Sequence, residues 1–144
     1  MVKVQIPNSK SSTQWWVQGV QSYPSGPSGR AKLDWIILKK KQNWDKPKEI
    51  QPVWSQQKGG RWVPRSRWEG KVIYVARLVC WAFQSDLNLT LEEALHSTTK
   101  QVCHHSLDEL DYRKGKISMK SREENNDQYT LEAKRKYGGV YRGG

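Results

Sequence analysis

The apolar residues of this chain fall in short runs of strand length, and turn-forming residues separate these runs. Residues 33–38 are apolar and partly β-branched, and residues 72–75 form a similar run. Gly59 and Gly60 lie between two further apolar segments, as the turn of a hairpin does. Runs of this length are typical of strands rather than of long helices. The sequence therefore predicts a fold built on a small antiparallel sheet.

Helical patterns follow these strands. Leu78, Trp81 and Ala82 recur at helical spacing, which predicts a short helix over residues 77–83. Thr90 and Glu93 have the spacing of a capping box, so a second helix is expected from there to about residue 97.

The C-terminal third reads as strand, loop, strand and helix. Residues 101–106 and 116–120 are the strand candidates. Ser121 and Glu124 form a second capping box before a helical stretch over residues 125–137, and glycines at 138 and 139 end it. The predicted fold class is α+β, with a small antiparallel sheet followed by a ββα unit.

A chain of 144 residues has room for one domain. Residues 22–29 are rich in Pro, Gly and Ser, which predicts a flexible N-terminal arm and linker over residues 1–29. A single domain is then expected over residues 30–137. It divides into a basic, Trp-rich sheet (30–71), short helices (72–100) and the ββα unit (101–137), with a tail at 138–144.

Positive charge is concentrated in the N-terminal half. The formal net charge is +11, and residues 1–80 hold 15 Lys and Arg against 4 Asp and Glu. Seven of the eight tryptophans lie there too. Basic side chains neutralise phosphates and aromatic rings stack on bases, so this half predicts a nucleic-acid surface. The alternative is that the tryptophans form the core and the lysines its solvated face. The candidate binding residues are Lys39, Lys40, Lys41, Lys58, Arg61, Arg65 and Arg67.

Other classes of protein fit the sequence less well. No run approaches the roughly 18 apolar residues of a membrane span, and the N-terminus lacks the apolar stretch of a signal peptide. Cys80 and Cys103 make neither a disulfide framework nor a zinc-binding pattern. We expect an intracellular protein with reduced thiols, neither secreted nor membrane-bound.

Histidine and asparagine pairs occupy corresponding places in the ββα unit. His104 and His105 close its first strand, while Asn125 and Asn126 lie in the first turn of its helix. A helix packed across the hairpin brings these positions together. An imidazole and an amide oxygen can hold a divalent cation, and a second histidine can deprotonate water. This combination is typical of metal-assisted phosphodiester hydrolysis.

The same residues resemble the HNH, or His-Me finger, nucleases, and in particular the small phage and intron-encoded homing endonucleases. The similarity lies in residues 102–104, in residues 117–121 and in Asn125, and an upstream strand and helix at 70–83 extend it. It covers about residues 70–137. The resemblance implies an enzyme, a metal-dependent DNA endonuclease that hydrolyses or nicks phosphodiester bonds.

The resemblance implies two alternative assignments. In the first, His104 is the general base, and Cys103 and Asn125 hold the cation. In the second, His104 is a metal ligand, His105 is the base and Asn126 is the second ligand. The implied cation is Mg²⁺ or Mn²⁺, with Zn²⁺ a poorer match. The candidates for holding the scissile phosphate are Arg113, Lys114 and Lys116.

The sequence also departs from the family pattern. Cys103 is a soft thiol where a hard oxygen ligand is expected, and Ala76 stands where the family has a histidine. Residues 107–112 lack the Asp-Gly loop of the family. These departures support a second hypothesis, a non-enzymatic nucleic-acid-binding protein such as a ribosomal or other ribonucleoprotein component or a viral accessory protein.

Both hypotheses make nucleic acid the partner, with DNA favoured and RNA also compatible. Neither predicts a membrane or a small-molecule substrate. The target sequence and the oligomeric state stay open.

Overall fold

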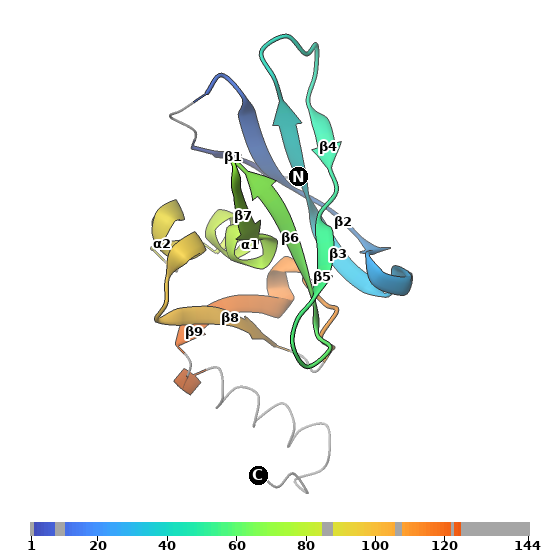
Figure 1. Ribbon diagram of the computed structural model, residues 1–144, viewed down its shortest axis with the longest axis vertical. Helices are drawn as coiled ribbons and strands as arrows, with labels where there is room; N and C mark the ends of the chain where they lie inside the picture. The colour runs from blue at the N-terminus through green and yellow to red at the C-terminus, as the bar shows by residue number, and fades with distance from the viewer. Residues whose placement is uncertain (1, 8–10, 85–87, 106–107, 122, 125–144) are drawn as a thin grey trace, which may run out of the picture.

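Three antiparallel sheets and two α-helices make up most of the described part of the chain (Figure 1). The computed structural model describes residues 2–7, 11–84, 88–105, 108–121 and 123–124. The strands are β1 (Lys3–Ile6), β2 (Gln14–Ser25), β3 (Ala31–Lys40), β4 (Lys48–Ile50), β5 (Val53–Gln56), β6 (Trp62–Trp68), β7 (Lys71–Tyr74), β8 (Lys100–His104) and β9 (Ile117–Ser121). The α-helices are α1 (Val75–Phe83) and α2 (Leu91–His96), and Pro27–Gly29 (η1) and Lys114–Lys116 (η3) form 3-10 turns. The predicted α+β class is confirmed.

The largest sheet has the strand order β1-β2-β3-β4. Along β2, Trp15 and Val17 are buried, whereas Trp16 and Gln18 are partly exposed. This alternation is the period-two pattern of a strand with one face on the core. Trp35 continues the buried face on β3. The alternative in which the tryptophans form the core is therefore correct for two of them, Trp15 and Trp35.

The N-terminal region differs from the predicted flexible arm and linker over residues 1–29. Strands β1 and β2 occupy most of it, and η1 is the turn that leads into β3. The first half of the Pro- and Gly-rich stretch, residues 22–25, is thus the end of β2, where residues 23–25 pair with β3, and residues 26–30 form the hairpin turn. Gly26 has a φ of 80°, and a side chain there would overlap the ring of Trp54. Glycine is required at this turn for both reasons.

A second sheet has the order β5-β6-β7. Its first turn contains the predicted glycines, Gly59 and Gly60, both with positive φ, and the Gly60 amide donates to the Gln57 carbonyl over 2.9 Å. The sequence predicts one sheet over the basic stretch of residues 30–71, and this prediction is wrong. The stretch is divided between the two sheets, because β4 pairs back onto β3 while β5 pairs onto β6.

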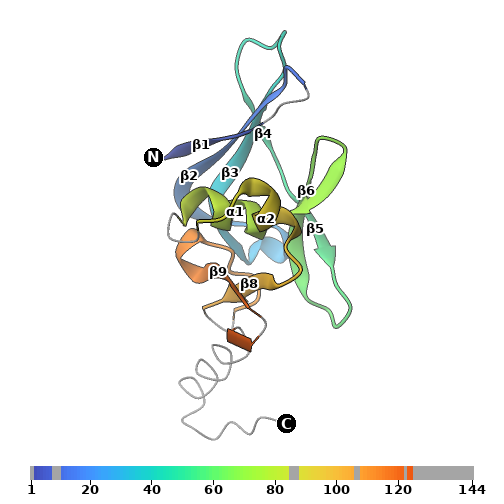
Figure 2. The ribbon, with the colours of Figure 1, turned by 90° about the vertical axis from the view of Figure 1, so that its left-hand side faces the viewer.

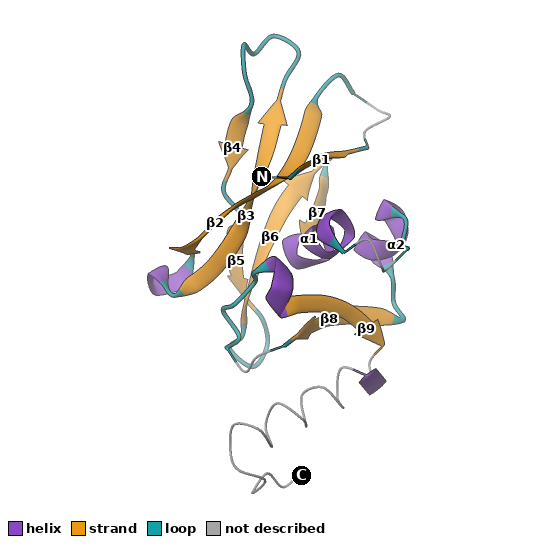
Figure 3. Cartoon of the chain, turned by 180° about the vertical axis from the view of Figure 1, so that it is seen from behind, coloured by secondary structure: helices purple, strands orange, loops and turns teal. Residues whose placement is uncertain are grey.

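The two helices lie beside each other on one side of the molecule (Figure 3). Helix α1 buries Leu78, Val79 and Cys80 in the main core. Helix α2 begins as predicted, with the Glu93 amide donating to Thr90 Oγ1 over 3.2 Å. No helix of the described residues is long and apolar enough to span a membrane.

Strands β8 and β9 form a separate hairpin below the two helices (Figure 2). Its apolar residues Ile117 and Met119 belong to the main core. After β9, the Glu124 amide donates to Ser121 Oγ over 3.2 Å, and the Ser121 amide donates to Glu124 Oε1 over 3.4 Å. This is the reciprocal bonding of a capping box. The helix and tail predicted over residues 125–144 lie outside the described residues.

Candidate functional site

The two histidines at the end of β8 lie on opposite faces of the hairpin. The register pairs Cys103 with Ser118 and His104 with Ile117. Because directly paired residues share a face and neighbours in a strand alternate, His104 lies on the core side with Ile117. His105 Nε2 lies 2.7 Å from Ser118 Oγ, so His105 shares the face of Cys103.

His104 lines a cleft of about 240 Å³. The cleft lies between the β5–β7 sheet, the start of α1 and strand β8, and its polar or aromatic lining includes Arg61, Tyr74, Arg77, Gln101, His104 and Tyr112. Two of these side chains are arginines, so the cleft is suited to an anion. The sequence analysis included Arg61 among the nucleic-acid ligands, and the structure brings it together with His104.

The environment of His104 favours the neutral imidazole. Burial, together with the positive charge of Arg61, lowers the pKa of His104 to about 4, against the opposing effect of the backbone and carboxylate of Asp111. Neither ring nitrogen is exposed, and neither has a partner in full hydrogen-bond geometry among the described residues. At neutral pH the ring is therefore uncharged and retains an acceptor nitrogen.

Tyr112 supports the base of the cleft, and sequence reasoning missed it. Its hydroxyl donates to the Trp62 carbonyl over 2.9 Å, and its carbonyl accepts from Trp35 Nε1 over 2.8 Å. These bonds tie the cleft to both larger sheets. Tyr112 lies in the loop between the two predicted strands at 101–106 and 116–120, where Leu110 and Tyr112 stand two apart and are both buried. That spacing was the available signal.

Arg77 is an anchor for the surrounding backbone. Its guanidinium donates to the carbonyls of Ala94, Ser97 and Lys100 over 3.1, 3.1 and 2.9 Å. These bonds connect α1 to the end of α2 and the start of β8. Since its donors are engaged in this way, Arg77 fixes the cleft wall. Arg61 lies beside the Tyr112 side chain, and its Nε is buried and has no hydrogen-bond partner among the described residues.

The opposite face of the hairpin holds Cys103. The thiol is buried and reduced, and Cys103 lies outside the main core cluster. Thiolates suit soft metal ions, whereas Mg²⁺ and Mn²⁺ prefer oxygen. Asn125 and Asn126, the predicted amide ligands, lie outside the described residues. Within the described ranges, no three His, Cys, Asp or Glu side chains gather as a metal site would require. The described donors therefore do not fit a hard divalent cation.

The three predicted phosphate ligands in the loop have different environments. Arg113 forms a two-point ion pair with Asp111, at 2.9 and 2.8 Å. Burial alone would raise the pKa of the Asp111 carboxyl, but the bonds from Arg113 outweigh burial, and the pKa of Asp111 is lowered. Lys114 lies over the ring of Phe83, with its Nζ 4.9 Å from the ring centroid. Lys116 is exposed. Lys116 is thus the most accessible of the three.

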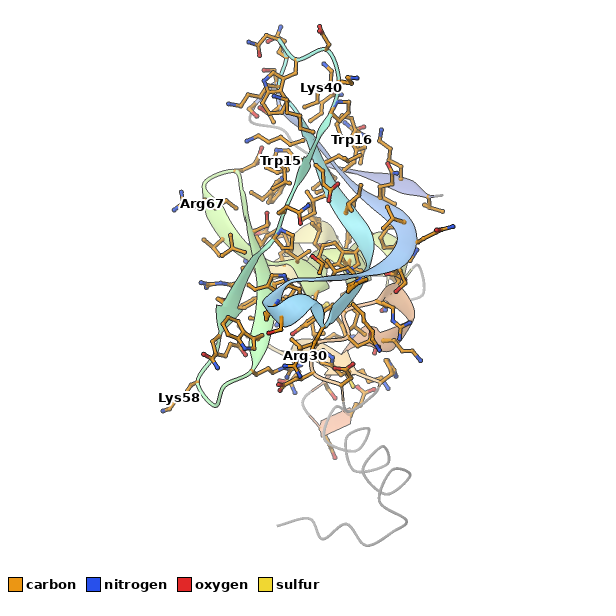
Figure 4. The ribbon with its side chains drawn as sticks, turned by 90° about the vertical axis from the view of Figure 1, so that its right-hand side faces the viewer. Trp15, Trp16, Arg30, Lys40, Lys58 and Arg67 are labelled. Atoms are coloured by element: carbon orange, nitrogen blue, oxygen red, sulfur yellow. The ribbon has the colours of Figure 1, made fainter. Side chains whose placement is uncertain are left out.

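The basic residues of the N-terminal half are spread over both larger sheets. Lys39 Nζ lies 4.9 Å from the ring centroid of Trp15, and Lys41 and Lys48 lie 5.7 and 4.5 Å from that of Trp44. Arg67 and Lys58 project from the β5–β7 sheet, whereas Lys40 extends from β3 (Figure 4). Arg65 is partly buried on β6. The structure therefore does not gather the predicted binding residues into one patch.

Comparisons with protein-family models, with curated proteins and with solved structures find no significant match for this chain.

Proposed function

We propose that the protein is a nucleic-acid endonuclease of the HNH type, which hydrolyses or nicks DNA with His104 as the general base. The observation that supports this most is the position of His104 at the end of β8, neutral and facing a cleft that also contains Arg61. A neutral imidazole accepts a proton from water, and a guanidinium binds a phosphate oxygen. The cleft thus pairs a base with an anion ligand.

The substrate itself favours this chemistry. A phosphodiester bound by Arg61 places negative charge near His104, which raises the pKa of the imidazole towards the neutral range where a general base works best. Because both ring nitrogens are shielded in the free protein, hydrolysis requires the cleft side chains to rearrange when the phosphodiester binds. The capping box of Ser121 and Glu124 supports the start of a helix directly after β9, as the ββα unit requires.

A divalent cation is part of the resemblance. The face of the hairpin that holds Cys103 presents a buried thiol, and no cluster of carboxylates with histidine or cysteine gathers there among the described residues. The proposal thus stands on base and phosphate positioning.

The experiment is a supercoiled-plasmid assay with purified protein in Mg²⁺, Mn²⁺ or EDTA. The His104→Ala/His105→Ala double variant is run beside it, and nicked and linear products are quantified. The proposal predicts nicking by the wild-type protein that the double variant lacks, and the three solutions show whether the cleavage depends on a divalent cation. Cleavage that persists at the same rate in the double variant would contradict it.

A second function is supported by Cys103. A soft, buried thiol stands at the position of the first metal ligand. It favours a ββα unit that only packs against the core and has no catalytic role, in a protein that binds nucleic acid without cleaving it. Salt-sensitive binding without cleavage in any of the three solutions would favour this alternative.

A further inference from the structure

The solvent-facing side of the four-stranded sheet has an unusual composition. Side chains on this face, which we call the outer face, alternate with the buried residues of β1, β2 and β3. They are Lys3, Gln5, Gln14, Trp16, Gln18, Ile36, Leu38 and Lys40. All are exposed or partly exposed, whereas their buried neighbours Trp15, Val17 and Trp35 are at most 6% exposed.

The register aligns the polar residues of this face in rows across the strands. Gln5 pairs with Trp16, and Trp16 pairs with Leu38. Lys3 pairs with Gln18 in the next row, and Gln14 pairs with Lys40 at the other end. Glutamine amides therefore stand in three successive rows, on an apolar support made by Trp16, Ile36 and Leu38.

We infer that this outer face docks into the major groove of duplex DNA, with the glutamines contacting base edges and the lysines contacting phosphates. A glutamine amide carries both a donor and an acceptor and pairs with the major-groove edge of adenine. All three glutamines lie on β1 and β2, the edge pair of the sheet, and a two-stranded ribbon is a width that the major groove admits. The inference extends the proposed function by naming its recognition surface, and it rests on nucleic-acid binding but not on hydrolysis.

The position of positive charge agrees with this orientation. Arg30 stands at the β2–β3 turn, and Lys40 stands at the opposite end of the ribbon (Figure 4). Lys32, near the turn, lies 3.8 Å from an Asp108 carboxylate oxygen. Both ends of the strands thus carry charges that phosphates would neutralise. Two acidic residues lie near these charges. Asp34 Oδ1 accepts from the Lys114 amide over 2.8 Å. Glu49 on β4 pairs with Leu38 and so shares the outer face, where its Oε1 accepts from Gln51 Nε2 over 2.6 Å.

Single strands and duplex RNA fit this face less well. Proteins bind single strands by stacking bases on open aromatic rings. The ring of Trp16 is instead occupied by Lys3, whose Nζ lies 4.7 Å from the ring centroid. The major groove of duplex RNA is deep and narrow and does not admit such a surface. The outer face therefore favours duplex DNA.

The test compares two double variants of equal charge change. Lys3→Glu/Lys40→Glu alters the outer face, and Lys71→Glu/Lys100→Glu alters β7 and β8. Binding to a fluorescent 30-base-pair DNA duplex of mixed sequence is measured by anisotropy in EDTA, so that cleavage plays no part. Circular dichroism and thermal unfolding verify that each variant is folded.

The inference predicts that Lys3→Glu/Lys40→Glu weakens binding by at least about tenfold and lowers the salt dependence by about two ion equivalents. The Lys71→Glu/Lys100→Glu control should change binding less than about threefold. Equal losses, a larger loss in the control, or equally tight binding of an RNA duplex would overturn it.

A second variant tests base contact without a charge change. Gln5→Ala/Gln18→Ala should keep its affinity for mixed-sequence DNA within about threefold but lose the sequence preference that wild-type protein shows when it selects duplexes from a random pool. An unchanged preference would overturn the assignment of base reading to this face. If the protein cleaves DNA but the outer-face variants bind DNA as tightly as the wild type, only this inference is rejected. If the outer-face variants weaken DNA binding but the wild-type protein does not cleave DNA, only the nuclease proposal is rejected.

Discussion

The ring of His104 meets the ring of Tyr112 edge to face, with centroids 5.0 Å apart and an interplanar angle of 82°. Tyr112 is itself bonded to Trp62 and Trp35, so His104 rests on a residue fixed by two sheets. Edge-to-face contact is a favoured geometry for aromatic rings. The orientation of the proposed base is therefore set by the core of the protein rather than by the loop that follows it.

Replacing Tyr112 with phenylalanine removes one hydrogen bond and keeps both rings in contact. We expect Tyr112→Phe to lower the free energy of unfolding by about 1 kcal/mol, because the buried Trp62 carbonyl loses its donor. Chemical denaturation measures this. Tyr74→Phe is the matched control, since Tyr74 is 42% exposed and should change stability little. Equal effects of the two variants would refute the assigned role of the Tyr112 hydroxyl.

His104 makes stability depend on pH below neutrality. Its pKa is about 4 in the folded protein and near its ordinary value of 6.5 in the unfolded chain. As the pH falls from 7 to 4, the unfolded chain takes up the proton first, so the contribution of His104 lowers the free energy of unfolding by up to about 3 kcal/mol. Unfolding of wild-type protein and His104→Gln at pH 7 and pH 4.5 measures this difference.

The variant should lose less stability on acidification than wild-type protein does. His96→Gln is the control, because His96 is exposed. A nuclear magnetic resonance titration showing His104 protonated near pH 6.5 in the folded protein would contradict this prediction.

Arg77 holds three carbonyls that a lysine cannot reach together. We expect Arg77→Lys to destabilise the protein by about 2–4 kcal/mol, since at least two buried acceptors lose a charged donor. Arg67→Lys provides the control at an exposed position on β6. Similar unfolding midpoints for the two variants would show that the Arg77 bonds contribute little.

Both cysteines should resist thiol reagents in the folded protein. Both side chains are buried, and burial raises the pKa of Cys80 to about 12, with the charge of Arg77 partly opposing the shift. The thiolate is the reactive form, so labelling at pH 8 should be slow in native protein and reach two equivalents per chain in denaturant. Rapid labelling of the native protein would show that a cysteine is accessible.

The parts of the fold predicted from the sequence are those with local signals. The run over residues 33–38 lies within β3, Gly59 and Gly60 form the predicted turn, and Thr90 caps α2. In each case the decisive interaction involves residues a few positions apart. The division of residues 30–71 between two sheets depends on which strands pair with each other. Those pairs join residues farther apart in the sequence, and the alternation of side chains along a strand does not identify its partner strand.

The candidate site was predictable in part. Sequence reasoning placed His104 and His105 at a strand end, which the structure confirms for His104. It did not reveal that the two rings face opposite ways, although alternation along a strand implies it. Tyr112 and Arg77 contact His104 or its cleft from loop and helix positions, and their tertiary partners lie outside any local pattern.

The most direct test of the account is a comparison of the two single variants under single-turnover conditions. Plasmid nicking rates are measured for wild-type protein, His104→Ala and His105→Ala, with DNA binding measured separately in EDTA. If His104 is the base, His104→Ala should lose about 10²–10⁴-fold in rate with binding unchanged, and His105→Ala should lose less than about tenfold. A large loss in His105→Ala with near-normal cleavage by His104→Ala would contradict the account and favour the alternative in which His105 is the base.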